Sequence, residues 1–233
     1  MNKPFVITIV GAESSGKTTL AMRLAEHFAC PWVPEYAREY LLSLGRPYNE
    51  ADLEIIAEKQ LETILSVVNR QSSAVSRQSI DLSAPDPLKG ALVDITSENQ
   101  YLEDLLISKI KKSKSKIQNP ESKILFVDGG MLNLRMWAKI KYGKSIPIVE
   151  KALMEDVTDL YLLCRPRSGW TPDPLREAPS LLDRTWIYNT YLEELVKGKK
   201  AFELIRKGKK KQFNSAVQII ESYYSESYVK NED

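Results

Sequence analysis

The sequence predicts an α/β fold in which a parallel β-sheet is flanked by helices on both faces. Short apolar runs rich in β-branched residues alternate with amphipathic segments of helical period, and several runs end at turn residues. Strands that alternate with helices pair in parallel, because each helix returns the chain to the same end of the sheet. The expected strands are 5–10, 31–34 (brief), 124–127, 160–164 and 202–205, and the expected helices are 17–28, 35–44, 51–68, 97–110, 131–142, 182–196 and 214–224.

The N-terminal elements are defined by their periods and by the residues that stop them. The run Phe5–Val10 is β-branched and ends at Gly11, and apolar residues in 17–28 recur at helical spacing. Prolines on both sides of 31–34 restrict it to a brief strand or turn, and Gly45 ends the helix that follows.

The middle of the chain loses this order. The segment 51–68 predicts a long amphipathic helix, but Gln71–Gly90 is rich in Ser and Pro and shows no period. A chain of 233 residues is of ordinary domain size. We therefore expect one domain over 1–233 that carries an insertion, partly flexible, over 71–122.

The later strands are continuous apolar runs, as in sheets that are covered on both faces. The run Ile124–Val127 is closed by Asp128, and Leu160–Cys164 leads into a segment rich in Arg and Pro. We expect this segment, residues 165–182, to form an irregular lid.

Composition excludes several classes of function. Lys+Arg 33 against Asp+Glu 31 leaves a net charge of +2, which predicts neither nucleic acid nor an anionic membrane as partner. A single histidine, His27, excludes a zinc site built from several histidines, and Cys30 and Cys164 fit buried, reduced thiols. No apolar run is long enough to span a bilayer. We expect a soluble cytoplasmic protein with an intact N-terminus.

The segment Gly11–Thr18 matches the phosphate-loop pattern G-x-x-x-x-G-K-[ST] between an apolar run and an amphipathic helix. The glycines let the backbone N–H groups point at phosphate oxygens, Lys17 can reach the β- and γ-phosphates, and Thr18 can ligate Mg²⁺. A Gly-rich turn that binds nothing is the alternative. The sequence thus predicts a P-loop NTPase fold with ATP and Mg²⁺ as cofactors. The predicted nucleotide-binding residues are Gly11, Ala12, Glu13, Ser14, Ser15, Gly16, Lys17, Thr18 and Thr19.

A P-loop protein needs an acid at the end of a neighbouring strand to order the Mg²⁺ shell. Asp128 ends the run 124–127 and is the candidate, with a helix N-cap as the alternative role. The chain shows no N-K-x-D guanine-specificity pattern, which disfavours a small GTPase.

A second group of polar and aromatic residues follows the brief strand. Glu35 and Arg38 are three apart on a predicted helix, at the rim where α/β sheets bind ligands. A carboxylate there can bind or deprotonate a sugar hydroxyl, whereas a surface ion pair is the alternative. Trp32, Tyr36 and Tyr40 can stack on a flat ring, and core packing explains them equally well.

The lid segment carries Arg165, Arg167, Trp170 and Arg176. Arginines in a mobile lid can close over a triphosphate and neutralise the charge that develops during transfer. A solvated Arg-rich loop is the alternative.

These segments together resemble the ribosylnicotinamide kinase domain of the NadR type and its stand-alone relatives. The resemblance covers nearly the whole chain outside about 71–122. The residues that carry it are Gly11–Leu20, Trp32–Leu41, Asp52–Leu53, Ile56–Ala57, Gln60, Phe126–Asp128, Trp137, Lys141–Gly143, Asp159–Leu163, Trp170 and Pro172–Glu177.

The resemblance implies transfer of the ATP γ-phosphate to the 5′-hydroxyl of nicotinamide riboside. It implies catalytic roles for Lys17, Glu35, Asp128 and Arg176, metal binding by Thr18 and Asp128, substrate binding by Trp32, Glu35, Tyr36, Arg38 and Asp173, and lid functions for Arg165, Trp170 and Arg176.

The chain departs from the family at two places. The family shows Asp-Thr-Asp where this chain has Asp128-Gly129-Gly130, so Gly130 replaces an acid. If that acid matters, kinase activity is weakened, Gly130→Asp should restore it, and the protein is instead an ATPase or nucleotide-dependent switch that acts on a protein partner. The second departure is the insertion 71–122, through which a protein partner or a second copy could bind.

Overall fold

The computed structural model describes residues 3–74, 123–170, 173–205 and 208–229, and its strands form one five-stranded sheet. Every strand pairing is parallel, and the strand order is β2-β3-β1-β4-β5. The strands are β1 (Phe5–Val10), β2 (Trp32–Val33), β3 (Ile124–Asp128), β4 (Leu160–Cys164) and β5 (Phe202–Ile205). The predicted α/β fold with a parallel sheet is confirmed.

The strand register places the chemistry at one edge of the sheet. Ile9 of β1 lies opposite Asp128 of β3, and Val10 lies opposite Leu163 of β4. The segments that follow these strands are the phosphate loop, the start of the next helix and the lid segment. They meet at the carboxyl edge, where ligands of α/β sheets bind.

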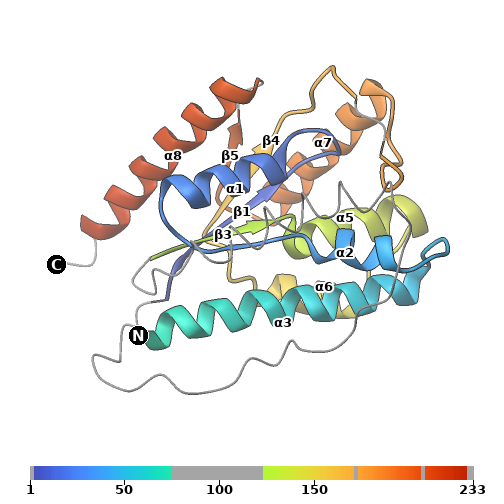
Figure 1. Cartoon of the computed structure of the whole chain (residues 1–233), viewed down its shortest axis with the longest axis horizontal. Coiled ribbons are helices and arrows are strands. Elements are labelled where there is room, and N and C mark those ends of the chain that lie inside the picture. Colours follow the sequence, from blue (N-terminus) through green and yellow to red (C-terminus); the bar gives the residue numbers. More distant parts are fainter. Residues whose placement is uncertain (1–2, 75–122, 171–172, 206–207, 230–233) are drawn as a thin grey trace, which may run out of the picture.

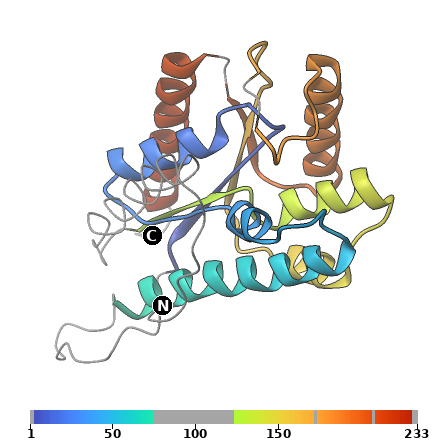
Figure 2. The same cartoon turned by 45° about the vertical axis from the view of Figure 1, so that its right-hand side comes forward.

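Two layers of helices enclose the sheet (Figures 1 and 2). Since successive side chains of a strand point to opposite faces, Ile7 and Ile9 pack against one layer while Val6 and Val10 pack against the other. The first layer is α1 (Lys17–His27) and α8 (Lys209–Val229). The second contains α3 (Glu50–Ala74), α5 (Gly130–Tyr142), α6 (Pro147–Met154) and α7 (Leu181–Lys197), while α2 (Tyr36–Ser43) packs against α3.

Helix α3 continues to Ala74, beyond the predicted helix end at residue 68, so the first four residues of the segment predicted as an insertion are helical. Gln71 is buried, and its Nε2 donates to the carbonyl of Ile124 at 3.4 Å, so this polar residue packs against the start of β3 instead of entering a loop. The rest of the insertion and the predicted helix 97–110 lie outside the described residues.

Three other helices differ from the sequence expectation. Helix α6 was not predicted, because its eight residues are too short to show a period, although Pro147 in its first turn is a helix-start signal. Helix α8 begins at Lys209 instead of 214, where lysines hide the apolar period. Helix α7 begins at Leu181, so the last two residues of the predicted lid 165–182 are helical.

Both cysteines are buried and free, as predicted. Burial raises the pKa of the Cys164 thiol to about 12, which makes it unreactive. Among the described helices, none combines the length and the apolar character needed to cross a bilayer.

Asp52 fixes the turn between α2 and α3. Its buried carboxylate binds the Arg46 guanidinium through two hydrogen bonds of 2.7 and 2.8 Å, and it accepts from the backbone N–H of Asn49 and the hydroxyl of Tyr40. The hydrogen bonds from Arg46 and Asn49 lower the pKa of Asp52 well below its ordinary value. This network holds α2, and with it Glu35, against α3.

We expect Asp52→Asn to lower the urea midpoint of unfolding at pH 7 and to lower it less at pH 3. The pKa of Asp52 is lower in the folded chain than its unfolded value of about 3.9. Its stabilisation is therefore present above that pH and is lost as the pH falls through the lowered pKa. Asp183→Asn, at an exposed position of α7, is the control. An equal loss at both pH values would contradict an ionic origin.

Candidate functional site

The phosphate loop has the curled backbone that an anion site requires. Gly11, Ser14 and Gly16 have φ values of 147°, 56° and 87°. A Cβ at Gly11 would lie 2.7 Å from the Cys164 carbonyl oxygen, and one at Gly16 would collide with the Arg167 guanidinium, so only glycine fits either position. Gly16 is also the N-cap of α1, and it has no side chain to cap the first-turn N–H groups. Those groups are available to an anion.

Two hydroxyls of the loop are buried without a protein partner. Neither Ser14 Oγ nor Ser15 Oγ has a hydrogen-bond partner among the described residues. Buried polar atoms are rarely left unpaired, so these hydroxyls suit a bound phosphate.

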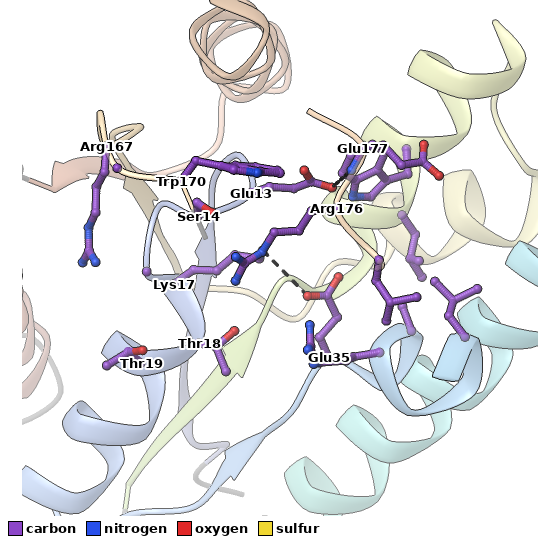
Figure 3. A pocket seen from close by; sticks show the side chains of 18 of the residues that line it. Glu13, Ser14, Lys17, Thr18, Thr19, Glu35, Arg167, Trp170, Arg176 and Glu177 are labelled. Atoms are coloured by element: carbon purple, nitrogen blue, oxygen red, sulfur yellow. Dashed lines mark hydrogen bonds and ion pairs between the residues drawn. The ribbon is translucent and has the colours of Figure 1, made fainter. Parts of the chain in front are cut away.

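Lys17 projects from the first turn of α1 into a pocket lined by carboxylates. Its Nζ lies 3.8 Å from Oε2 of Glu35, and the two side chains face one another in Figure 3. Burial favours the neutral amine, but the charges of Glu35, Asp128 and Glu13 prevail and raise the pKa of Lys17. The ammonium therefore stays charged at neutral pH.

Glu35 is held from the opposite side by a buried network. Asn133 Nδ2 of α5 donates to Glu35 Oε1, and the Tyr191 hydroxyl of α7 donates to Asn133 Oδ1. Asn133 and Tyr191 are buried. Burial, followed by the charges of Glu35 and Asp128, raises the pKa of Tyr191 well above its ordinary value, so it remains a donor. No sequence pattern marked these two residues, because they lie within helices whose periods indicated packing alone.

Asp128 ends β3 beside Lys17 and is almost fully buried. Burial raises the pKa of its carboxyl to about 7, and Glu35 adds to this effect, whereas Lys17 and the Thr18 hydroxyl oppose it. Neither carboxylate oxygen has a hydrogen bond of ordinary geometry from the described part of the chain.

These oxygens fit a magnesium ion. Mg²⁺ prefers hard oxygen ligands and usually takes one or two from protein and the rest from phosphates and water. Asp128 offers two buried, unsaturated oxygens, and Thr18 offers an exposed hydroxyl nearby. Within the described ranges, no cluster of three acidic, His or Cys side chains could hold a metal alone. A nucleotide would have to complete the site.

Of the predicted lid residues, Trp170 and Arg176 line the pocket, while Arg165 is exposed and does not. Arg167, which the sequence placed in the lid segment without a role of its own, also lines it and donates to Gln212 Oε1. Gln212 Nε2 in turn donates to the Ser15 carbonyl at 3.1 Å, so α8 joins the lid segment to the phosphate loop.

Two predicted substrate residues bind each other. Arg38 Nη2 of α2 lies 2.8 Å from Asp173 Oδ2, and Arg176 Nε lies 3.9 Å from the same oxygen. The pKa of Asp173 is lowered, because hydrogen bonds from Arg38 and the Leu175 N–H and the charges of Arg38 and Arg176 outweigh the effect of burial. The pair joins α2 to the lid segment across the pocket.

The pocket is a cavity of about 760 Å³ lined by two chemically different sets of residues. That volume lies within the range of small-molecule sites. One set is polar and consists of Glu13, Ser14, Gly16, Lys17, Thr18, Thr19, Glu35 and Arg167. The other is apolar and aromatic and consists of Ala37, Leu41, Tyr48, Leu53, Leu134 and Trp137.

Trp32 and Tyr36, which were expected to stack on a ligand ring, are not among the residues that line this cavity. They pack against the core clusters on the two faces of the sheet. Tyr48 and Trp137 supply the aromatic surface instead.

Comparison with solved structures shows the fold. The chain matches the crystal structure of NadR protein in complex with NR at 18% identity and a TM-score of 0.62, over 94% of this chain and 51% of that one. It matches NadR protein in complex with NAD and AMP-PNP at 18% identity and a TM-score of 0.59, over 94% and 49%. The chain thus spans about half the length of these NadR chains. The resemblance noted in the sequence is confirmed at the level of fold.

No curated protein sequence matches the chain. A family model described as an AAA domain matches residues 6–87 and 93–211, which together form most of the chain and include the phosphate loop, Asp128 and the lid segment. With its parallel sheet and phosphate loop, the protein is a P-loop NTPase-type domain and belongs to this AAA domain family.

Proposed function

We propose that this protein is a nucleoside kinase that transfers the γ-phosphate of ATP to the 5′-hydroxyl of nicotinamide riboside or a similar nucleoside. One observation carries the proposal: Glu35 lines the same cavity as the phosphate-binding residues and the aromatic residues, which we take as its two ends, and it is held by Lys17 and Asn133. A carboxylate between these two ends would lie between a phosphoryl donor and a hydroxyl acceptor.

The polar end suits the donor. Lys17, the first-turn N–H groups of α1 and the loop hydroxyls provide the positive charge and hydrogen bonds that bind phosphates in P-loop proteins. Thr18 and Asp128 would hold Mg²⁺, which when bound neutralises charge on the β- and γ-phosphate oxygens. Arg167 and Arg176 line the same end and would bind the transferring group.

The aromatic end suits a nucleoside acceptor. Trp137 offers a flat surface to a planar base, Tyr48 can offer only the ring face that Lys141 does not cover, and Leu41 and Leu134 complete an apolar wall. Arg38 also borders the cavity and is kept in place by Asp173, so it could orient the ribose. An enzyme that only hydrolyses ATP has no need of such a compartment.

The acceptor hydroxyl oxygen forms the new bond to the γ-phosphorus, the bond to the β–γ bridging oxygen breaks, and ADP leaves. Glu35 takes the hydroxyl proton, while Asn133 keeps its carboxylate aimed at the acceptor. Lys17 and Arg176 offset the charge on the phosphoryl oxygens.

The ATPase or switch alternative depends on Gly130 and on the insertion, and most of the insertion lies outside the described residues. Gly130 has φ +61°, and a Cβ there would lie 3.2 Å from Thr8 Cγ2 and 3.4 Å from Val127 Cγ1. Neither Thr8 nor Val127 lines the cavity. The Cβ of a side chain at position 130 would therefore point toward the sheet. This direction does not support the idea that the replacement of an acid by Gly130 removes kinase activity.

Lys17→Ala should weaken ATP binding by about 10- to 100-fold, since a charge-assisted hydrogen bond in a partly buried site contributes about 1.5–3 kcal/mol. Isothermal titration with ATP and Mg²⁺ measures this. Lys59→Ala on the exposed surface of α3 is the control and should bind ATP like the wild type. Unchanged affinity in Lys17→Ala would remove the assignment of the site.

Glu35→Gln should reduce kcat for phosphorylation of nicotinamide riboside by about 10²- to 10⁴-fold, the usual contribution of a general base, with KM for ATP little changed. Chromatographic detection of the phosphorylated nucleoside measures this. Glu39→Gln, on the exposed face of the same helix, is the control. If the wild type hydrolyses ATP yet phosphorylates no nucleoside, the ATPase or switch alternative replaces the kinase.

Gly130→Asp should destabilise the protein and should not raise kinase activity. Its positive φ strains any other residue by roughly 1–3 kcal/mol, and the contact with Thr8 adds to this cost. Gly45→Asp is the matched control, because Gly45 has a similar φ of +64° but nothing within 4 Å of its Cβ position. Thermal unfolding should show a larger loss at 130 than at 45. A gain in kinase activity in Gly130→Asp would instead show that the missing acid matters for the reaction.

A further inference from the structure

Glu13 belongs to the phosphate loop, yet its carboxylate is engaged elsewhere. Oε1 accepts from the backbone N–H of Glu177 at 3.0 Å, and Oε2 accepts from that of Ala178 at 2.9 Å. Glu13 is only 8% exposed. Both oxygens of a nearly buried carboxylate are thus used to hold a peptide segment that lies 164 residues further along the chain.

The same segment is held from its carbonyl side by Arg184 of α7. This arginine is 1% exposed and donates to the carbonyls of Ala178 at 3.4 Å and Pro179 at 2.9 Å. It also donates to the carbonyl of Arg167 at 3.1 Å. The C-terminal end of the lid segment is therefore hydrogen-bonded on one side to the Glu13 carboxylate of the phosphate loop and on the other to the Arg184 guanidinium of α7.

Arg176 directly precedes the gripped peptide and lines the cavity opposite the phosphate loop (Figure 3). The direction of its side chain depends on the backbone that Glu13 holds. Ser14, the residue after Glu13, has φ 56°, an uncommon conformation for a residue with a side chain. A change in the loop at this point would move the Glu13 carboxylate and with it the N–H groups of residues 177 and 178.

We propose that Glu13 is a positioning residue that couples occupancy of the phosphate loop to the placement of Arg176. The proposal rests on the proposed function, since the occupant of the loop is ATP. Phosphates that fix the loop fix the Glu13 carboxylate, and this carboxylate orders the backbone that carries Arg176. Coupling of this kind is reciprocal, so an ordered segment at 176–178 also favours the nucleotide-bound loop.

The acceptor geometry explains why this position carries a glutamate. Glutamine has the same length but only one acceptor oxygen, so it can satisfy one of the two N–H groups. Aspartate keeps the charge and both oxygens but is shorter by one methylene. Glutamine therefore removes one acceptor and the charge together, whereas aspartate keeps both but cannot reach as far.

Amide hydrogen exchange, followed residue by residue by NMR, tests the coupling without requiring turnover. In the wild type, Mg²⁺ with a non-hydrolysable ATP analogue should slow exchange at both Glu177 and Ala178. In Glu13→Gln at least one of these two amides should exchange about 10-fold faster without nucleotide, as expected for a lost hydrogen bond to a charged group. The nucleotide should still protect Thr18 in that variant, but it should no longer protect both Glu177 and Ala178.

Glu58→Gln, on the exposed surface of α3, is the control and should match the wild type at every amide. Glu13→Asp should change exchange at Glu177 and Ala178 in the same direction as Glu13→Gln, and it serves as the test should the glutamine variant fail to fold. Wild-type nucleotide protection of Glu177 and Ala178 in either folded variant overturns the proposal. So does the absence of any nucleotide response at these amides in the wild type.

The kinase proposal fails separately. If the wild-type protein shows the nucleotide response but phosphorylates no nucleoside, the coupling proposal stands and the kinase proposal is wrong. Where phosphotransfer is measurable, a double-mutant cycle with Arg176→Ala adds a second test. If Glu13 acts through Arg176, Glu13→Gln should lower kcat in the wild type but have little further effect in Arg176→Ala. Full additivity would contradict an action through Arg176.

Discussion

The charges of the site depend on one interaction, between the Lys17 ammonium and the three carboxylates near it. Lys17, whose side chain is only 15% exposed, remains charged because Glu35, Asp128 and Glu13 outweigh the effect of burial. These acids would repel a triphosphate if all three presented free negative charge to it. Each has a different local environment that limits this repulsion, and those environments come from different elements of the fold.

Glu13 is engaged by two backbone N–H groups, Glu35 by Asn133, and Asp128 has a pKa raised to about 7. Of the three, only Asp128 has no hydrogen bond of ordinary geometry from the described residues, which is why it suits a metal. Further positive charge comes from Arg167 and Arg176, which line the same cavity. An anionic nucleotide accompanied by Mg²⁺ would therefore complete the charge balance of this pocket.

The parts of the site that the sequence predicted are local in the chain. The phosphate loop is a contiguous motif between a strand and a helix, and Asp128 directly ends an apolar run, so the neighbouring residues specify both. The sheet followed in the same way from its apolar runs.

The parts that it did not predict arise from contacts between distant segments. Asn133 and Tyr191 meet across 58 residues, and Gln212 reaches Ser15 across 197, so no local pattern marks them. The aromatic residues show the same limit. Trp32 lies in β2 and Tyr36 begins α2, close to the expected site, but both pack against the core clusters. Trp137 lines the cavity from a helix whose apolar period could not show which of its faces does so.

The attachments of the lid segment differ greatly in strength, and this difference bears on which part of the segment can move when a ligand binds. The Arg38–Asp173 ion pair has an arginine side chain that is 47% exposed, so solvent screening limits it to about 1 kcal/mol or less. Residues 177–179 are held by the buried Arg184 and the nearly buried Glu13. Breaking these hydrogen bonds would leave both charges uncompensated inside the protein. The Arg38–Asp173 contact can therefore break at little cost while the backbone next to Arg176 stays fixed.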